Sequence, residues 1–298
     1  MNLIWKASAS ASALHAVHAL ARGLALVPPG LAEALGPLVA GPPSAAQKDL
    51  PGLTAGLLQY AAAGCEQNRQ LAEQALAKHG GRDKLDEADV SELADWVSRV
   101  EQAYFQWHRG QTGRQLADEI ATRTVPMRDH WDARGPGMIR QIERLTEPWL
   151  VAERVEVVMV LPVVGGDGTA HLPANVVTIE ALLANVDPQL PEVVRLAWLA
   201  SQLQFDLPAI AEQIPPGRLP HIAALAMLPA TLAAAEAVEL AEYSTESLSS
   251  ALQLWRVAST AAEVQPLAET LTQWWDSYQS SDMALAAAVA SLEATLVE

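Results

Sequence analysis

The segment VEVVMVLPVVGGDGTAHLPANVVTIEA, residues 155–181, decides the fold of this 298-residue chain. Val155–Val164 is mostly β-branched or apolar on both faces, which indicates a strand that other layers cover on two sides. Pro162 has no backbone N–H, so the end of this strand is predicted at an edge or a bulge. Gly165–Gly168 has the composition of a tight turn, and Asn175–Ala181 that of a second strand. These residues therefore predict a β-hairpin.

Most of the remaining chain has the apolar spacing of α-helices. Between Val90 and Trp107, apolar side chains recur every three or four positions, so one face of this helix is predicted to be buried. Similar stripes run through residues 53–75 and 248–296, and residues 1–30 are predicted as an amphipathic helix. Two strands alone are marginally stable, so helices must cover them. The predicted fold class is mainly α, of the α+β type: an irregular multi-helix fold with one central β-hairpin packed between helices.

The breaks along the chain are short. Segments rich in Pro and Gly, such as VPPG at residues 27–30 and IPPG at 214–217, are neither long nor polar enough for a flexible linker. We therefore expect an all-helical N-terminal half over residues 1–146. The hairpin and further helices follow over residues 147–298, packed with the first half as one continuous body.

Charge excludes one class of partner. The formal net charge is −16, and the sequence has no cluster of Lys and Arg of the kind that draws phosphate groups. Ten acidic residues against Arg256 alone in residues 231–298 make one end of the chain acidic. A solvated helical face explains this, and a basic partner is the alternative. We expect no nucleic acid, and a protein or peptide as the partner.

The apolar runs and the cysteine content of the sequence indicate where in the cell the protein is expected. No uninterrupted apolar run of about 18 residues is present, so no membrane association is expected. Cys65 is the single cysteine, which excludes an internal disulfide framework and suggests a reducing compartment. A cytoplasmic protein is therefore expected. Abundant Ala, and Arg in place of Lys, are typical of a GC-rich bacterial genome.

The histidines are the first candidates for a metal site. His15 and His18 share one helical face and could reach the same ion, but no third ligand accompanies them, and hydrogen-bonded packing is the alternative. MRDHWDARGPG, residues 127–137, places His130 among acidic and basic side chains and is interpreted as a salt-bridged surface turn. Gly165–Gly168 is not followed by the lysine of a phosphate-binding loop. No metal and no cofactor are expected.

The apolar helix that starts at Pro191 allows a comparison with a known family. A long strand, a glycine-rich loop, a second strand and this helix resemble, over residues 150–205, the core of zincin-type metallopeptidases. In that family the helix carries an HExxH motif, and the preceding strand lines the substrate groove. The five motif positions fall here on Arg195–Leu199, which contain neither histidine nor glutamate. The resemblance implies a pseudo-peptidase without zinc, and a purely structural buried helix is the alternative reading.

A guanidinium in so apolar a helix needs a carboxylate, and Glu180 and Glu192 are the nearest candidates in the sequence for pairing with Arg195. No arrangement of the seven histidines and many carboxylates has catalytic spacing. We therefore predict a non-catalytic, partner-binding or structural protein. Its candidate groove consists of Arg195, Trp198, Asn175, Glu180 and His171. The alternative is a hydrolase whose acid–base set assembles from distant residues, namely His130, His171 and Glu180.

Overall fold

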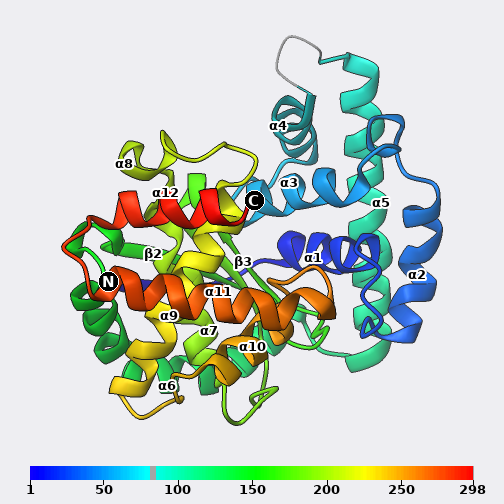
Figure 1. Ribbon diagram of the computed structural model, residues 1–298. Helices are drawn as coiled ribbons and strands as arrows, with labels where there is room; N and C mark the ends of the chain where they lie inside the picture. Colours follow the sequence, from blue (N-terminus) through cyan, green and yellow to red (C-terminus); the bar gives the residue numbers. More distant parts are fainter. Residues whose placement is uncertain (81–84, 298) are drawn as a thin grey trace.

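The computed structural model describes residues 1–80 and 85–297 and is mainly helical, as predicted (Figure 1). The strands are β1 (Asn2–Ala7), β2 (Arg154–Val160), β3 (Gly168–His171) and β4 (Val176–Glu180). The helices of the first half are α1 (Ala9–Ala21), α2 (Pro29–Ala40), α3 (Leu50–Ala62), α4 (Asn68–Gly80), α5 (Glu87–Thr112) and α6 (Leu116–Leu145). Those of the second half are α7 (Glu192–Ser201), α8 (Pro208–Ala211), α9 (Leu219–Ala237), α10 (Thr245–Leu254), α11 (Ala261–Gln279) and α12 (Leu285–Thr295). Short 3-10 helices include η5 (Leu203–Asp206).

Within the described residues, the strands form one four-stranded mixed sheet in the order β1-β2-β4-β3. β1 and β4 both pair with β2 in parallel, and β3 pairs with β4 antiparallel. The predicted hairpin of Val155–Val164 with Asn175–Ala181 is therefore wrong: these strands are parallel neighbours, and the hairpin is β3–β4. After β2, the chain folds back as β3 before it enters β4. β3 escaped prediction because four residues of mixed polarity are too short for a clear pattern.

The N-terminal residues also depart from expectation. Residues 2–7, predicted as the start of a helix, form β1 and pair with Arg154–Met159 of β2. The expectation of an all-helical half over residues 1–146 is therefore wrong at its beginning. Partly buried Leu3 and Trp5 pack against the core, so tertiary contacts favour an extended chain in a segment that was assigned to an amphipathic helix.

Helices cover both faces of the sheet (Figure 1). Successive residues of a strand point to opposite faces. On one face Glu180 meets His15 of α1, and on the other Gly168 lies against Leu199 of α7. α6 contacts β1 and β2, and α7 also contacts β3 and β4. This double cover explains why Val155–Val160 is apolar on both faces.

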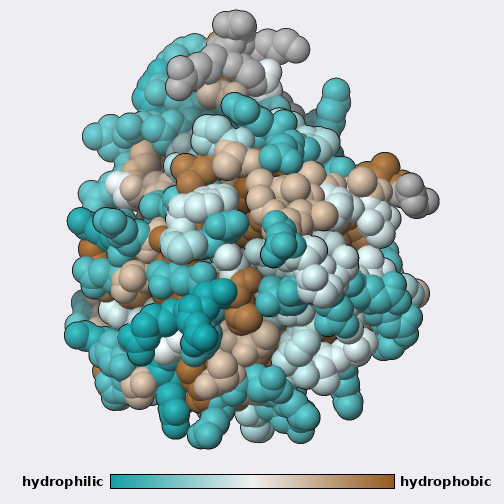
Figure 2. Space-filling view, turned by 60° about the vertical axis from the view of Figure 1, so that its left-hand side comes forward, coloured by the Kyte–Doolittle hydropathy of each residue, from teal (hydrophilic) through white to brown (hydrophobic). Residues whose placement is uncertain are grey.

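The helix α9 is the interior helix of the second half. In the described part of the chain, it is the helix long and apolar enough to cross a membrane, but 67% of the apolar window is buried inside the protein. It packs on α6, α7 and α11. Figure 2 shows hydrophilic side chains over most of one face of the molecule, with hydrophobic ones in small separated groups. α9 is therefore a core helix of this fold.

Candidate functional site

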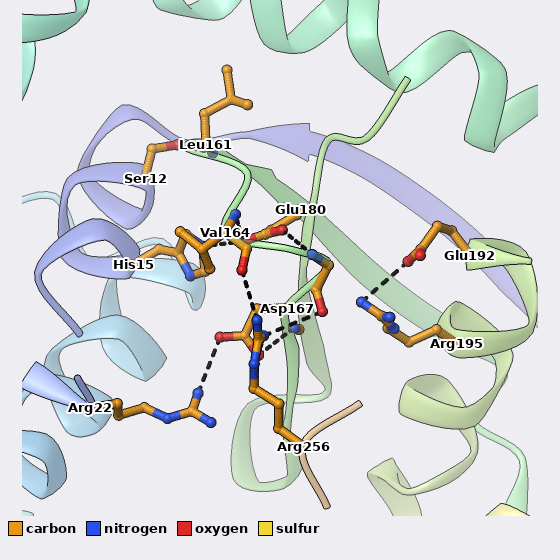
Figure 3. Close-up of polar contacts among 12 residues, drawn as sticks. Ser12, His15, Arg22, Leu161, Val164, Asp167, Glu180, Glu192, Arg195 and Arg256 are labelled. Atoms are coloured by element: carbon orange, nitrogen blue, oxygen red, sulfur yellow. Dashed lines mark hydrogen bonds and ion pairs between the residues drawn. The ribbon is translucent and has the colours of Figure 1, made fainter. Parts of the chain in front are cut away.

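Charged side chains gather where β2 and β4 end, around the loop from Leu161 to Asp167 (Figure 3). α1 contributes from one side of the sheet, α7 from the other, and the turn after α10 closes the group. In doubly covered sheets, ligand sites lie at such carboxyl ends of parallel strands. We call this group the charge cluster; its members are His15, Arg22, Asp167, Glu180, Glu192, Arg195 and Arg256.

Glu180 is the fully buried centre of the charge cluster. Its Oε1 accepts hydrogen bonds from His15 Nε2 at 2.9 Å and from the Val164 N–H at 2.7 Å. Its Oε2 accepts a hydrogen bond from the Gly166 N–H at 2.8 Å. A buried carboxylate is stable only when its oxygens are well supplied with donors. Glu180 therefore fixes the loop before β3 and ties it to α1.

His15 is the cationic partner of Glu180. Burial lowers the pKa of His15, but the hydrogen bond and the negative charge of Glu180 outweigh this effect and raise the pKa above its ordinary value. The charge of Asp167 acts in the same direction. The contact is therefore an ion pair that joins α1 to β4.

Asp167 joins two arginines across the loop. Arg22 Nη1 lies 3.1 Å from one carboxylate oxygen, and Arg256 Nη1 lies 3.5 Å from the other. Arg256 Nη2 also donates to the Val164 carbonyl at 2.7 Å. Burial raises the pKa of Asp167. The positive charges of His15 and of the two arginines lower it by more, so the net shift of the pKa is downward. Asp167 is therefore the ionised anchor between α1 and the turn after α10.

Arg195 and Glu192 form the least satisfied pair of the charge cluster. Arg195 Nη1 lies 3.3 Å from Glu192 Oε2, and the side chains are only 2% and 4% exposed. Within the described residues, Nε and Nη1 of Arg195 and both oxygens of Glu192 have no hydrogen-bond partner. Burial lowers the pKa of Arg195 and raises that of Glu192. The charge of each partner acts in the opposite direction but does not outweigh burial. The attraction between the two side chains therefore does not offset the free-energy cost of removing their charges from water.

Arg195 also explains a glycine of the loop. Gly166 has a φ of +81°, and a Cβ atom at this position would collide with the Arg195 guanidinium. The guanidinium carbon lies 5.8 Å from the centre of the Trp255 ring, which provides a cation–π contact. Gly166 is therefore required both by its backbone conformation and by the close approach of Arg195.

A cavity of about 440 Å³ lies beside β3. Residues of α3, α4, η5 and the start of α9 contribute to its lining. Consecutive residues of β3, with side chains on both faces of the sheet, line the cavity, so the backbone edge of the strand borders it. We call this cavity the β3 groove; its lining includes His18, Leu58, Lys78, Thr169, Ala170, His171, Asp206 and Leu219.

β3 is an edge strand in the described part of the chain. The Glu180 N–H donates to the Asp167 carbonyl at 3.0 Å, and hydrogen-bonded pairs alternate along an antiparallel ladder. Gly168 and Ala170 therefore direct their backbone groups away from β4. The Gly168 N–H is bound by Asp167 Oδ1 at 3.1 Å. The groups at the free edge are thus the Gly168 carbonyl and the N–H and carbonyl of Ala170.

Two neutral histidines line the β3 groove. His18 Nδ1 lies 2.9 Å from Thr54 Oγ1, and His171 Nε2 lies 3.0 Å from Thr178 Oγ1. Burial and the charge of Arg22 lower the pKa of His18 to about 4. Burial and the charge of Lys78 lower the pKa of His171 to about 3. Both side chains are therefore uncharged hydrogen-bonding groups at neutral pH.

These pKa shifts predict a stability maximum near pH 6.5. Below this pH, His18 and His171 become protonated in the unfolded chain but stay neutral in the folded protein. Between pH 6.5 and 5.5, each histidine therefore lowers the free energy of unfolding by about 1 kcal/mol, and the two together lower it by about 2 kcal/mol. The pKa of His15 is raised in the folded protein. The stabilisation that His15 provides is therefore complete below pH 6.5 and is lost as the pH rises through its folded-state pKa. Urea denaturation at pH 5.5, 6.5 and 8.0 measures both limbs. His18→Gln and His171→Gln should each remove about half of the acid loss; an unchanged acid limb in both variants would contradict the assignment.

The candidate residues from the sequence are separated in the structure. Arg195 and Trp198 are buried, and the Trp198 indole donates to the Ala224 carbonyl at 2.8 Å, so neither faces the β3 groove. Asn175 adopts a left-handed backbone conformation before β4. Of the set Arg195, Trp198, Asn175, Glu180 and His171, the structure places His171 in the lining of the β3 groove.

The acid–base set of the alternative hydrolase is divided as well. His130 lines a small cavity between α6 and the start of α7, His171 lines the β3 groove, and Glu180 binds His15. The interpretation of residues 127–137 as a surface turn is wrong, because they continue α6 despite Pro126 and Pro136. His15 and His18 contact Glu180 and Thr54, respectively.

Sequence reasoning missed three members of the charge cluster: Arg22, Asp167 and Arg256. Asp167 was assigned to a turn, and the arginines lie 145 residues before it and 89 residues after it. Among the described residues, no group of three or more His, Cys, Asp or Glu side chains is placed to hold a metal ion. In comparisons with family models, curated proteins and solved structures, the chain matches none of them.

Proposed function

We propose that this protein is a non-catalytic peptide-binding protein, and that the free edge of β3 receives an extended peptide as an additional strand. The observation that supports this most directly is the coincidence of an unpaired strand edge with a cavity of about 440 Å³ in the described residues. Edge strands expose unpaired N–H and carbonyl groups, which natural proteins cover or use for binding. Here the free edge of β3 borders that cavity.

The groove lining suits an extended segment with apolar side chains. Leu58, Leu172 and Leu219 lie in the lining, together with several prolines, while His18 and His171 offer neutral hydrogen-bonding groups. Backbone hydrogen bonds provide affinity in this mode of recognition, and pockets for alternate side chains provide specificity. The preferred ligand is therefore an extended peptide with apolar residues on the side that faces the groove.

The charge cluster has a structural role in this proposal. Glu180 and Asp167 hold the loop that leads into β3, so the edge strand is presented in one conformation. A preorganised binding strand loses less conformational entropy when the ligand binds. The ion pairs thus support peptide binding indirectly, because they hold β3 in the conformation that receives the peptide.

The resemblance to zincin-type peptidases agrees with a peptide ligand. In that family a strand before the motif helix lines the substrate groove, and α7 here has Arg195–Leu199 in place of the HExxH motif. We therefore include a pseudo-peptidase origin in the proposal, in which peptide binding is retained without hydrolysis. The composition, with a single cysteine and abundant Ala and Arg, supports a role in the bacterial cytoplasm.

The test uses the backbone of Ala170. Ala170→Pro removes the outward N–H without removing a hydrogen bond to β4, so peptides selected from a random display library on the original protein should bind at least about tenfold more weakly. Ala284→Pro is the matched control, because Ala284 is exposed and already has a φ of −63°. Fluorescence polarisation measures affinity, and thermal melts check folding.

Peptides methylated at alternate backbone nitrogens provide a second readout that does not depend on the variant's fold. Methylation in one register should abolish binding, and methylation in the other register should have little effect. Equal binding to Ala170→Pro and the original protein, together with insensitivity to methylation, would refute strand addition.

A further inference from the structure

Lys78 is the cationic side chain of the β3 groove in the part of the chain that the structure describes. It lies in the last turn of α4 and lines the groove together with His171, the last residue of β3. The positive charge of Lys78 lowers the pKa of His171, so the two side chains are near each other. Asp206 of η5 provides a negative charge in the same lining. Lys78 is therefore placed to meet an anionic group of a ligand where β3 ends.

A buried side chain fixes the position of the Lys78 ammonium. Its Nζ donates a hydrogen bond to Oε1 of Gln59, which is 7% exposed on α3 and also lines the groove. An ammonium has three N–H donors, so the hydrogen bond to Gln59 leaves donors for a ligand. The groove thus presents a positioned cation.

The surroundings of Lys78 differ from those of the arginines in the charge cluster. Arg22 and Arg256 are both paired with Asp167. Within the described residues, burial of part of the Lys78 side chain lowers its pKa, and no neighbouring carboxylate raises it. In a chain with 35 acidic and 19 basic residues, a lysine without such a neighbour is an exception. A carboxylate of the ligand would supply the missing partner.

A second concavity, of about 550 Å³, meets the β3 groove at Lys78. Lys78 lines both, and Tyr60, Gln74 and Ala77 continue the lining of the second one along α3 and α4. An extended ligand can therefore pass Lys78 and continue over Tyr60. A carboxylate at Lys78 then belongs to a side chain within the peptide rather than to the end of the peptide.

We propose that the β3 groove selects peptides with an acidic side chain, and that Lys78 binds this carboxylate next to the peptide residues that add to β3. This inference rests on the proposed strand addition and names its specificity. A hydrogen bond between an ammonium and a carboxylate is about twice as strong as one between neutral groups. The preferred ligand is an extended apolar segment with Asp or Glu at one end, followed by further residues over the second concavity.

Selection of peptides from a random display library, on the original protein and on Lys78→Gln, tests this specificity. Peptides selected on the original protein should carry Asp or Glu at a fixed distance from their apolar residues, and peptides selected on Lys78→Gln should not. A library that yields no binding peptide would refute strand addition itself. Peptides that depend on Ala170 but carry no acidic residue at a fixed position would overturn the role of Lys78 alone.

Fluorescence polarisation with one selected peptide and its amide analogue measures the pairing. Replacement of the acidic side chain by its amide should weaken binding to the original protein at least about fivefold, and binding to Lys78→Gln by less than about twofold. Lys78→Arg should restore the preference for the acid. The same preference in the original protein and in Lys78→Gln, with unchanged melting temperatures, would rule out Lys78 as the partner.

Two control variants and a shortened peptide complete the test. Lys48→Gln, at an exposed position outside the groove lining, and Asp206→Asn, which removes the negative charge of the lining, should both keep the preference for the acid. A peptide that ends at the acidic residue with an amide should bind more weakly than the full peptide. Equal binding of the two would contradict a path beyond Lys78.

Discussion

Glu180→Ala is expected to lower the free energy of unfolding by about 3–5 kcal/mol, as is typical when one partner of a buried ion pair is removed. The substitution leaves a cationic His15 and the N–H groups of Val164 and Gly166 without their acceptor in the interior. Unpaired buried donors are costly because they have lost water and gained nothing in exchange. Urea denaturation at pH 6.5 measures the effect.

Glu156→Ala is the matched control for this prediction. Glu156 lies on the neighbouring strand β2 and pairs with Lys6 at 2.6 Å, but both side chains are partly exposed. A surface pair of this kind contributes about 1 kcal/mol or less. The double variant His15→Ala/Glu180→Ala should be less destabilised than the sum of its single variants, because the coupled partners are removed together. If Glu180→Ala costs no more than Glu156→Ala, Glu180 is not the centre of the charge cluster.

Arg195→Met is expected to cost about 3–5 kcal/mol, since it leaves the nearly buried Glu192 carboxylate without a counter-charge. The double variant Glu192→Met/Arg195→Met should return to within about 1 kcal/mol of the original protein or exceed it. No hydrogen bond joins the two side chains. Burial raises the pKa of Glu192 and lowers that of Arg195, so it disfavours the charged form of both. Two apolar side chains of similar length remove this desolvation penalty.

The four proteins of this cycle are compared by urea denaturation at the same pH. A double variant that loses as much as the two single variants together would mean that Arg195 and Glu192 contribute independently. Arg195 would then be stabilised mainly by its Trp255 contact, which Trp255→Leu would test directly.

Several features of the fold were predictable because they depend on local patterns. The strands around Val157 and Ile179, and most of the helices, follow from β-branched runs and from apolar residues at helical spacing. The need for layers on both sides of β2 followed from its two apolar faces. The pairing of Arg195 with Glu192 was one of two predicted choices, since residues three apart are neighbours on a helix.

The order and direction of the strands were decided by the tertiary structure. Apolarity marks a buried strand but does not reveal whether its neighbour is parallel, so the β2–β4 pair was predicted as a hairpin. β1 became a strand because β2 offered it an edge, and β3 became one because β4 did. Such short segments take the conformation that their neighbours satisfy.

The sequence by itself determined that this chain is acidic, mainly helical and built around a buried apolar strand pair. Only the tertiary structure decided where its chemistry lies. Glu180 meets His15 across 165 residues, and Asp167 meets Arg22 across 145 residues, which no local spacing can encode. The physical reason is that charges in the interior must find partners in space rather than in sequence, and the position of each partner is fixed by helix and strand packing.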